Sequence, residues 1–317
     1  MDQLASSAMI AVRDCMGAKK GERVLVVTDD RKEEIGRAIY EAARQLGCEP
    51  MMVVMPPRQR NGEEPPKAVA EAMKAADVVL CPTSKSLSHT DARHEACKAG
   101  ARIATLPGIT ADCMARTLGA DYGRIKERTE KLVKAFEGVK TVRIKAPAGT
   151  DITMSVEGRH FGPDTGVITA AGDFGNLPAG EAYVAPLEGT AEGVVAIDGA
   201  MSGYGVADEP IIMEVKGGYA VKITGPSDID RLNRLIEPLG MPARNIAELG
   251  IGTNDKAVIT GLVLEDEKVM GTIHIAIGDN SHFGGKVAVS SHLDGIVKSP
   301  TVWADGRLIM KDGELIV

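Results

Sequence analysis

Short continuous apolar runs alternate with segments of helical spacing along the first 140 residues. Strands are predicted for the runs rich in β-branched residues, at 23–28, 49–55, 77–81 and 101–106. Helices are predicted where apolar residues recur every three to four positions, at 32–46, 65–76, 90–98 and, largely, 110–140. Because uniformly apolar strands that alternate with helices are typical of covered parallel sheets, residues 1–140 are expected to form an α/β, Rossmann-like domain.

From residue 141 onward glycine becomes more frequent, and the apolar runs are shorter. Strands are expected at 141–145, 151–156, 193–197, 211–215 and 219–223. One helix is predicted at 227–239, with Ser227 as its cap and Gly240 as its terminator. Asp305-Gly306 and Asp312-Gly313 predict hairpin turns near the C-terminus. Residues 141–317 are therefore expected to form a β-rich α+β domain.

Candidate chemistry is concentrated between residues 273 and 295, where three of the six histidines lie. His292 and Asp294 are two positions apart, so on an extended segment they point to the same face. His274 alternates with isoleucines, which predicts that its imidazole projects away from them. A single strand histidine is more often a hydrogen-bonded structural residue. Two histidines and a carboxylate in one short segment, however, fit a metal site as well as they fit structural roles, and these ligands suit zinc, cobalt, manganese or iron.

Two further carboxylates lie in Gly-flanked, apolar surroundings. Glu181 follows the sequence Asn-Leu-Pro-Ala-Gly, and Glu248 is the only charge in the segment 246–252. Each alone fits a capping or surface residue as well as a ligand, and the acidic run 265–267 fits a solvated turn. The residues by themselves therefore lead to a candidate metal site made of Glu248, His274, His292 and Asp294.

Composition excludes several other classes of function. The net charge is −7, with acidic and basic residues interleaved, which favours neither a nucleic-acid partner nor a membrane surface. Five cysteines without a Cys-x-x-Cys pair are typical of a reduced cytoplasm. Residues 1–16 predict an amphipathic helix and no leader or membrane span. The first strand is followed by Thr28-Asp29-Asp30-Arg31, where a nucleotide cofactor would need a Gly-rich loop.

Taken together, these residues resemble the aminopeptidase T and aminopeptidase S family of metallopeptidases. The resemblance covers residues 149–295, and more loosely the whole chain. It is carried by the blocks Gly149-Thr150-Asp151-Ile152-Thr153 with Gly158-Arg159, then 176–181, 247–250, 266–278 and 292–294. It implies that two neighbouring divalent ions of zinc, cobalt or manganese are bound by Glu181, Glu248, His274, His292 and Asp294, with Glu248 bridging them.

The resemblance also implies a reaction. Water activated by two ions would hydrolyse a peptide or small amide at a free N-terminus, with Glu248 as a catalytic residue. The family has a tyrosine shortly after the first histidine block, whereas residues 279–283 here read Asp-Asn-Ser-His-Phe. His282 is therefore the candidate for a polarising or proton-transferring group. A homodimer or higher homo-oligomer is expected from the same resemblance.

Two alternatives remain. The chain also resembles the 2,5-dihydroxypyridine 5,6-dioxygenases, in which one Fe(II) would be bound by a facial triad such as His274, His292 and Asp294. That family has a histidine at the position of Glu248 and lacks a carboxylate at that of Glu181, which favours the hydrolase. The third alternative is a metal- or small-molecule-binding protein that has lost turnover.

Overall fold

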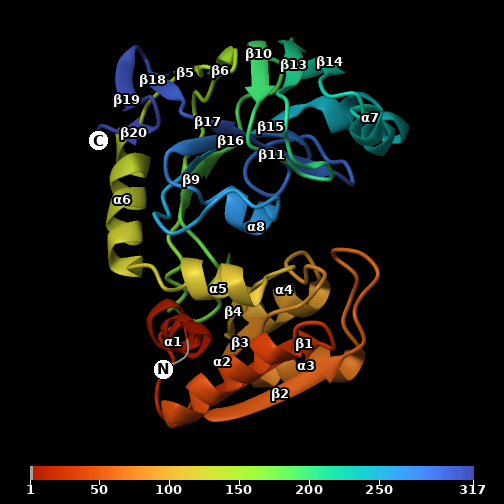
Figure 1. Cartoon of the computed structure of the whole chain (residues 1–317). Helices are drawn as coiled ribbons and strands as arrows, with labels where there is room; N and C mark the ends of the chain where they lie inside the picture. Colours follow the sequence, from red (N-terminus) through yellow and green to blue (C-terminus); the bar gives the residue numbers. More distant parts are fainter. Residues whose placement is uncertain (1–2) are drawn as a thin grey trace. The chain divides into compact units, whose positions relative to one another are not determined.

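The computed structural model describes residues 3–317, which form two compact units (Figure 1). The first comprises the chain up to Lys126 together with Asp164–Ala179, and the second comprises Glu127–Pro163 and Gly180–Val317. The expected boundary at residue 140 differs from this division. The chain passes from the first unit to the second within helix α6, Tyr122–Ala135, and later returns.

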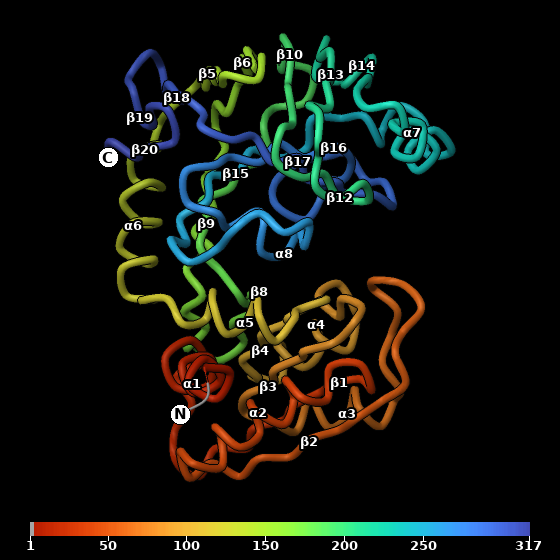
Figure 2. The backbone as a smooth tube through the Cα atoms, viewed as in Figure 1, coloured from red at the N-terminus to blue at the C-terminus, as the bar shows by residue number. Residues whose placement is uncertain are grey.

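The first unit contains a parallel five-stranded sheet in the order β2-β1-β3-β4-β8. Its strands are β1 Arg23–Asp29, β2 Glu49–Met55, β3 Val78–Cys81, β4 Arg102–Thr105 and β8 Phe174–Asn176. Strand β8 pairs with β4 through Ile103 and Phe174, and Figure 2 shows the backbone returning to this edge. Sequence analysis missed β8 because it has only three residues in a Gly-rich stretch.

Helices cover both faces of this sheet. They are α1 Gln3–Ile10, which continues as a π-helical turn Ala11–Cys15, α2 Glu33–Gln45, α3 Lys67–Ala75, α4 Asp91–Lys98 and α5 Ala111–Thr117. Leu25 and Val27 belong to a core cluster with residues of α3 and α4. Gly36 of α2 lies against Thr28 on the opposite face. The predicted α/β architecture is confirmed, except that the predicted segment 110–140 forms two helices, α5 and α6.

The second unit consists mainly of two antiparallel sheets. The larger sheet has the strand order β14-β13-β10-β6-β5-β18-β19-β20. Its strands are β5 Thr141–Lys145, β6 Asp151–Ser155, β10 Glu192–Ile197, β13 Ile211–Lys216, β14 Tyr219–Thr224, β18 Thr301–Ala304, β19 Arg307–Lys311 and β20 Glu314–Leu315. The smaller sheet has the strand order β12-β11-β17-β16-β15-β9-β7. Its strands are β7 Gly162–Asp164, β9 Glu181–Val184, β11 Ala200–Met201, β12 Gly205–Val206, β15 Ile246–Gly252, β16 Thr272–Gly278 and β17 His292–Lys298.

One hydrophobic core joins the two sheets of the second unit. Val142 and Ile144 of β5 belong to the same buried cluster as Ile273, Ile275 and Ile277 of β16. Since successive strand residues point to opposite faces, the intervening residues of β16 project away from this core. The β-rich second domain is confirmed, and the face opposite its core is available for polar side chains.

The two hairpin turns predicted for this unit form as expected, but its helix begins later than predicted. Asp305-Gly306 joins β18 to β19 and Asp312-Gly313 joins β19 to β20, all four with positive φ, as the hairpin prediction required. The predicted cap at Ser227 is wrong: helix α7, Asp230–Ile236, begins three residues later, after Ile229, and no side chain caps it.

Shorter helical segments complete this unit, namely the 3-10 turns Glu237–Leu239 and Met241–Arg244 and helix α8, Val263–Asp266. Within residues 3–317, no helix has both the length and the apolar character that a membrane crossing requires.

Candidate metal centre

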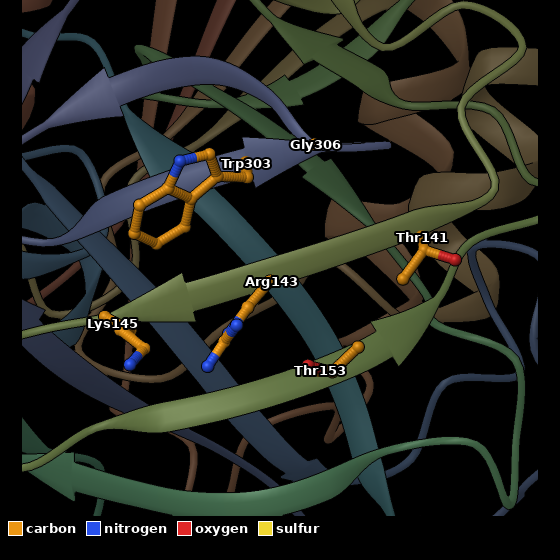
Figure 3. A pocket seen from close by; sticks show the side chains of 6 residues that line it. All are labelled: Thr141, Arg143, Lys145, Thr153, Trp303 and Gly306. Carbon is orange, nitrogen blue, oxygen red and sulfur yellow. The ribbon is translucent and has the colours of Figure 1, made fainter.

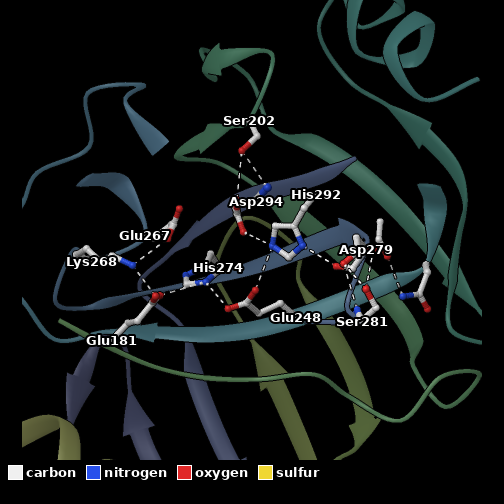
Figure 4. Close-up of polar contacts among 12 residues, drawn as sticks. Glu181, Ser202, Glu248, Glu267, Lys268, His274, Asp279, Ser281, His292 and Asp294 are labelled. Carbon is white, nitrogen blue, oxygen red and sulfur yellow. Dashed lines mark hydrogen bonds and ion pairs between the residues drawn. The ribbon is translucent and has the colours of Figure 1, made fainter. Parts of the chain in front are cut away.

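Four adjacent strands, β17, β16, β15 and β9, present polar side chains on the face that is turned away from the core (Figure 4). The register pairs Gly250 with His274, Gly252 with Glu181, and Ala276 with both Glu248 and Asp294. His292 lies on the same face, opposite Gly278. All five ligands expected from the sequence are therefore side by side, although they come from four strands that span more than 110 positions.

Their ligand atoms form two groups. Glu181, Glu267 and His274 make one, named the Glu181 cluster, and Glu248, His292 and Asp294 make the other, named the Glu248 cluster. Each combines one imidazole with two carboxylates. The expected iron triad of His274, His292 and Asp294 is not one of the groups found among the described residues.

Distances within the Glu248 cluster fit a shared cation. Nε2 of His292 lies 3.1 Å from Oε2 of Glu248 and 3.2 Å from Oδ1 of Asp294. Ligand bonds of about 2.0–2.2 Å around a zinc-like ion place neighbouring donor atoms roughly 3–3.5 Å apart. Glu248 also reaches toward the Glu181 cluster, because its Oε1 lies 3.6 Å from Nε2 of His274. Two imidazoles and buried carboxylates therefore fit a divalent metal ion.

Groups behind the Glu248 cluster orient its ligands. Nδ1 of His292 lies 2.7 Å from the carbonyl oxygen of Asp279, an arrangement in which Nδ1–H donates and Nε2 is the nitrogen that faces the carboxylates. The backbone N–H of Asp294 donates to Oγ of Ser202 at 3.0 Å, and that hydroxyl is 3.4 Å from Oδ2 of Asp294. A hydrogen bond to the second ring nitrogen is characteristic of metal-binding histidines.

Sequence analysis did not identify Glu267 and Lys268 as site residues. The side chain of Lys268 is 1% exposed, and its Nζ donates to Oε1 of Glu181 and lies 3.0 Å from Oε2 of Glu267. Both residues follow α8: Glu267 ends the acidic run 265–267 that was predicted to be a solvated turn, and Lys268 comes directly after it. The adjacent charges Asp-Glu-Lys gave no periodic signal of burial, so only the position of the turn against β9 shows their role.

Charges at the site shift one another's pKa values. Burial alone would lower the pKa of His292, but Asp294 and Glu248 outweigh it and raise that pKa well above its usual value. Burial likewise opposes protonation of His274, yet Glu181 and Glu248 raise its pKa to about 9. Despite burial, the two imidazoles lower the pKa of Glu248. Without an ion, the histidines therefore serve as the cations that balance these carboxylates.

A glycine makes room for the ring of His274. A Cβ atom at Gly250 would lie 2.0 Å from Cε1 and 2.2 Å from Nε2 of that imidazole. The ring is buried at 1% exposure and Nε2 is the atom that faces the carboxylates, so a methyl group here would push the imidazole out of its place beside Glu181 and Glu248. The sequence showed a Gly-rich segment around Glu248, but only the strand register shows what the glycine faces.

We expect Gly250→Ala to destabilise the protein by about 1–3 kcal/mol, the usual cost of an overpacked core, and to weaken metal binding at least about tenfold. Thermal unfolding and a metal titration would measure both effects. Gly123→Ala is the matched control, because its Cβ would meet only a carboxylate oxygen of the exposed Asp121. Unchanged unfolding and metal affinity in Gly250→Ala would contradict this account of the glycine.

Aromatic rings border the Glu248 cluster. The ring of Phe283 makes edge-to-face contacts with His292, at 5.7 Å between centroids, and with Tyr183, at 6.0 Å. Tyr183 lies two residues after Glu181 and therefore on the same face of β9. His282, the expected polarising group, is exposed and belongs to neither cluster. His292 is contacted by Phe283, the neighbour of His282, and by the carbonyl oxygen of Asp279 at the start of this loop.

A separate hollow of about 570 Å³ lies on the outer face of the larger sheet (Figure 3). Thr141, Arg143 and Lys145 of β5 line it together with Trp303 of β18. The two basic side chains form ion pairs with Asp151. None of the predicted ligands lines this hollow, so the chemistry of the chain is concentrated on the other sheet.

Comparison with known proteins identifies the family. Residues 8–317 match the family model described as NicX: 2,5-dihydroxypyridine 5,6-dioxygenase, so the chain belongs to that family. The 2,5-dihydroxypyridine 5,6-dioxygenase of Pseudomonas putida is 22% identical over 262 residues, which cover 78% of this chain and 73% of that protein.

Two solved structures share the fold over nearly the full length. A 2,5-dihydroxypyridine dioxygenase from Pseudomonas putida KT2440 has a TM-score of 0.83 at 19% identity, covering 99% of this chain and 97% of that one. Wild-type AmpT from Thermus thermophilus has a TM-score of 0.74 at 18% identity, covering 99% of each. The expected resemblance to both groups is thus found at the level of the fold, while the family match is to the dioxygenases.

Proposed function

We propose that this member of the dihydroxypyridine dioxygenase family is a metal-dependent hydrolase that cleaves a small amide or peptide beside a free amine. The observation that carries the proposal is the grouping of the ligand atoms. Each cluster has one imidazole and two carboxylates, whereas an oxygen-activating Fe(II) site of the facial-triad type has two imidazoles and one carboxylate on one ion. A carboxylate-rich donor set favours hydrolytic metals.

Glu248, His292 and Asp294 would bind the metal ion. A bound ion would lower the pKa of a coordinated water to near neutrality and polarise the scissile carbonyl. The hydrogen bonds of Asp279 to His292 and of Ser202 to Asp294 support the role of these residues as ligands, because they would hold the two ligands in a fixed orientation. Four carboxylates against one ammonium and one divalent ion would leave the loaded site with an excess of negative charge, which supports binding of a substrate through a protonated or metal-coordinated amine.

A second candidate function is Fe(II)-dependent ring opening of a dihydroxylated pyridine. The family match over residues 8–317 and the dioxygenase fold at a TM-score of 0.83 favour it. In this case His274 would have to join His292 and Asp294 on one ion, with Glu248 displaced from between the two rings. Phe283 and Tyr183 would then offer an aromatic border to a planar substrate.

Metal analysis and two assays distinguish the candidates. Protein purified anaerobically without added metal would be analysed for its elements, then assayed with a panel of aminoacyl amides and, separately, for oxygen uptake with 2,5-dihydroxypyridine. We expect zinc, cobalt or manganese and amide hydrolysis. Asp294→Asn should lower the turnover on the order of 10²–10³-fold, the loss typical of one charge-stabilising group.

The control for these assays is His89→Ala, which removes an exposed histidine of the other unit and should keep full activity. Iron in the purified protein, together with oxygen uptake that Asp294→Asn abolishes, would replace the hydrolase by the dioxygenase. Bound metal without turnover of either substrate class would favour a binding protein that has lost catalysis.

A further inference from the structure

A buried ammonium lies inside one of the two candidate metal clusters. Lys268 is 1% exposed, and its Nζ contacts one oxygen of each carboxylate of the Glu181 cluster, Glu181 and Glu267 (Figure 4). A buried ammonium loses the free energy of its hydration, and only partners of opposite charge compensate this loss. An ammonium without such partners would therefore not be buried this deeply. The carboxylates of the Glu181 cluster are thus already bonded to a cation that belongs to the chain.

No such cation serves the Glu248 cluster. In the described part of the chain, Glu248 and Asp294 form ion pairs with histidines but with no lysine or arginine. A divalent ion bound to the oxygens that contact Lys268 would lie no more than about 5 Å from its ammonium, given ligand bonds of about 2 Å, and an ion bound to the other oxygen of each carboxylate no more than roughly 7 Å. At either distance the two cations would repel each other strongly in a buried place. An ion in the Glu248 cluster would bind carboxylates that have no ammonium partner.

The two histidines differ in the hydrogen bonding of Nδ1, and this difference also favours the Glu248 cluster as the place of the ion. Nδ1 of His292 lies 2.7 Å from the carbonyl oxygen of Asp279, the orientation found in metal-binding histidines. Nδ1 of His274 is buried and has no hydrogen-bond partner within residues 3–317. His274 is therefore held by the carboxylates at Nε2 alone, 3.3 Å from Glu181 and 3.6 Å from Glu248, and lacks the second bond that fixes a metal ligand.

We propose that the Lys268 ammonium is the permanent cation of the Glu181 cluster, so that the chain binds one divalent ion, in the Glu248 cluster. This inference rests on the proposed metal centre and replaces the two ions implied by the sequence resemblance. Lys268 then acts as a positioning residue: it fixes Glu181 and Glu267 beside the ion, and Glu181 in turn faces His274. The centre combines a fixed charge with an exchangeable one.

The test is the number of Mn²⁺ or Zn²⁺ ions per chain, measured by calorimetric titration and by elemental analysis after gel filtration. We expect one ion in the unsubstituted protein and in Lys268→Arg, which keeps the charge. Lys268→Met has a similar length without the charge and should bind two. The control Lys222→Met removes a lysine that pairs with Glu214 on the surface, and should bind one.

Two ions in the unsubstituted protein would overturn the inference while leaving a metal centre in place. One ion in a folded Lys268→Met would also overturn it, because the ammonium would then not be what excludes the second ion. Absence of any binding would overturn both this inference and the proposed function. If Lys268→Met does not fold, Lys268→Gln decides, because its amide keeps a hydrogen-bond donor without the charge: the inference requires that it bind two ions, and one ion in this variant would contradict it.

Discussion

Replacing His292 by alanine is expected to lower the affinity for a divalent ion by roughly 100-fold or more, beyond the 10–100-fold typical of groups behind the ligands. The imidazole is the only nitrogen donor of the Glu248 cluster, and its Nε2 lies within 3.2 Å of both carboxylates. Its loss leaves Glu248 and Asp294 close together without a neutral ligand between them. Turnover should fall with metal occupancy under either proposed reaction.

A titration followed by calorimetry would measure this affinity, with circular dichroism to show that the fold is kept. The side chain of His292 is 29% exposed, so its removal creates little buried cavity. His94→Ala is a suitable control, since His94 is exposed on α4 of the other unit. Metal affinity within about threefold of the unsubstituted protein would show that the Glu248 cluster is not the binding site.

Metal affinity is also expected to rise with pH, about tenfold per pH unit for each proton displaced. Despite burial, Asp294 and Glu248 raise the pKa of His292, so its imidazole is protonated at neutral pH and must lose that proton before it can bind an ion. Glu181 and Glu248 likewise outweigh burial and raise the pKa of His274 to about 9, so this neighbouring imidazole also carries a proton at neutral pH.

The stability of the metal-free protein is expected to change with pH in the opposite direction to the metal affinity: it falls as the pH rises. A histidine with a raised pKa stabilises the fold fully below its unfolded pKa of about 6.5, and this contribution is lost as the pH rises through the folded value. Melting temperatures of metal-free and metal-loaded protein, measured from pH 6 to 9, should therefore diverge as the pH rises. His292→Ala should reduce the divergence, and a gap that stays constant over this range would contradict the assignment.

Alternation along strands was enough to predict much of this site. It placed His292 and Asp294 on one face and His274 on the face opposite its isoleucines, and the buried isoleucines of β16 agree. Glu248 was added because it is the only charge in an apolar, Gly-rich segment, whereas Glu181 was added only by resemblance to a family. Their convergence depends on the pairing of β9 with β15, which is a long-range property of the sheet.

What could not be predicted has a common physical cause. Lys268 and Glu267 lie in a charged turn whose local composition is that of a solvated surface, and Lys268 is buried there with its ammonium paired to Glu181 of β9 and to Glu267. The strand β8 and the division of the chain within α6 likewise depend on which distant segment completes a sheet edge. Periodicity reports which face of an element is buried and does not report what covers it.

The return of Asp164–Ala179 to the first unit has a consequence for synthesis on the ribosome. Strand β4 has β3 on one side and β8 on the other, and β8 follows it by about 70 residues in which strands of the second unit are made. Until β8 has left the exit tunnel, the nascent sheet has an unpaired edge, which is the kind of edge that recruits other chains. Translation of this protein therefore passes through an interval in which neither unit is finished, and chaperone binding would be most useful there.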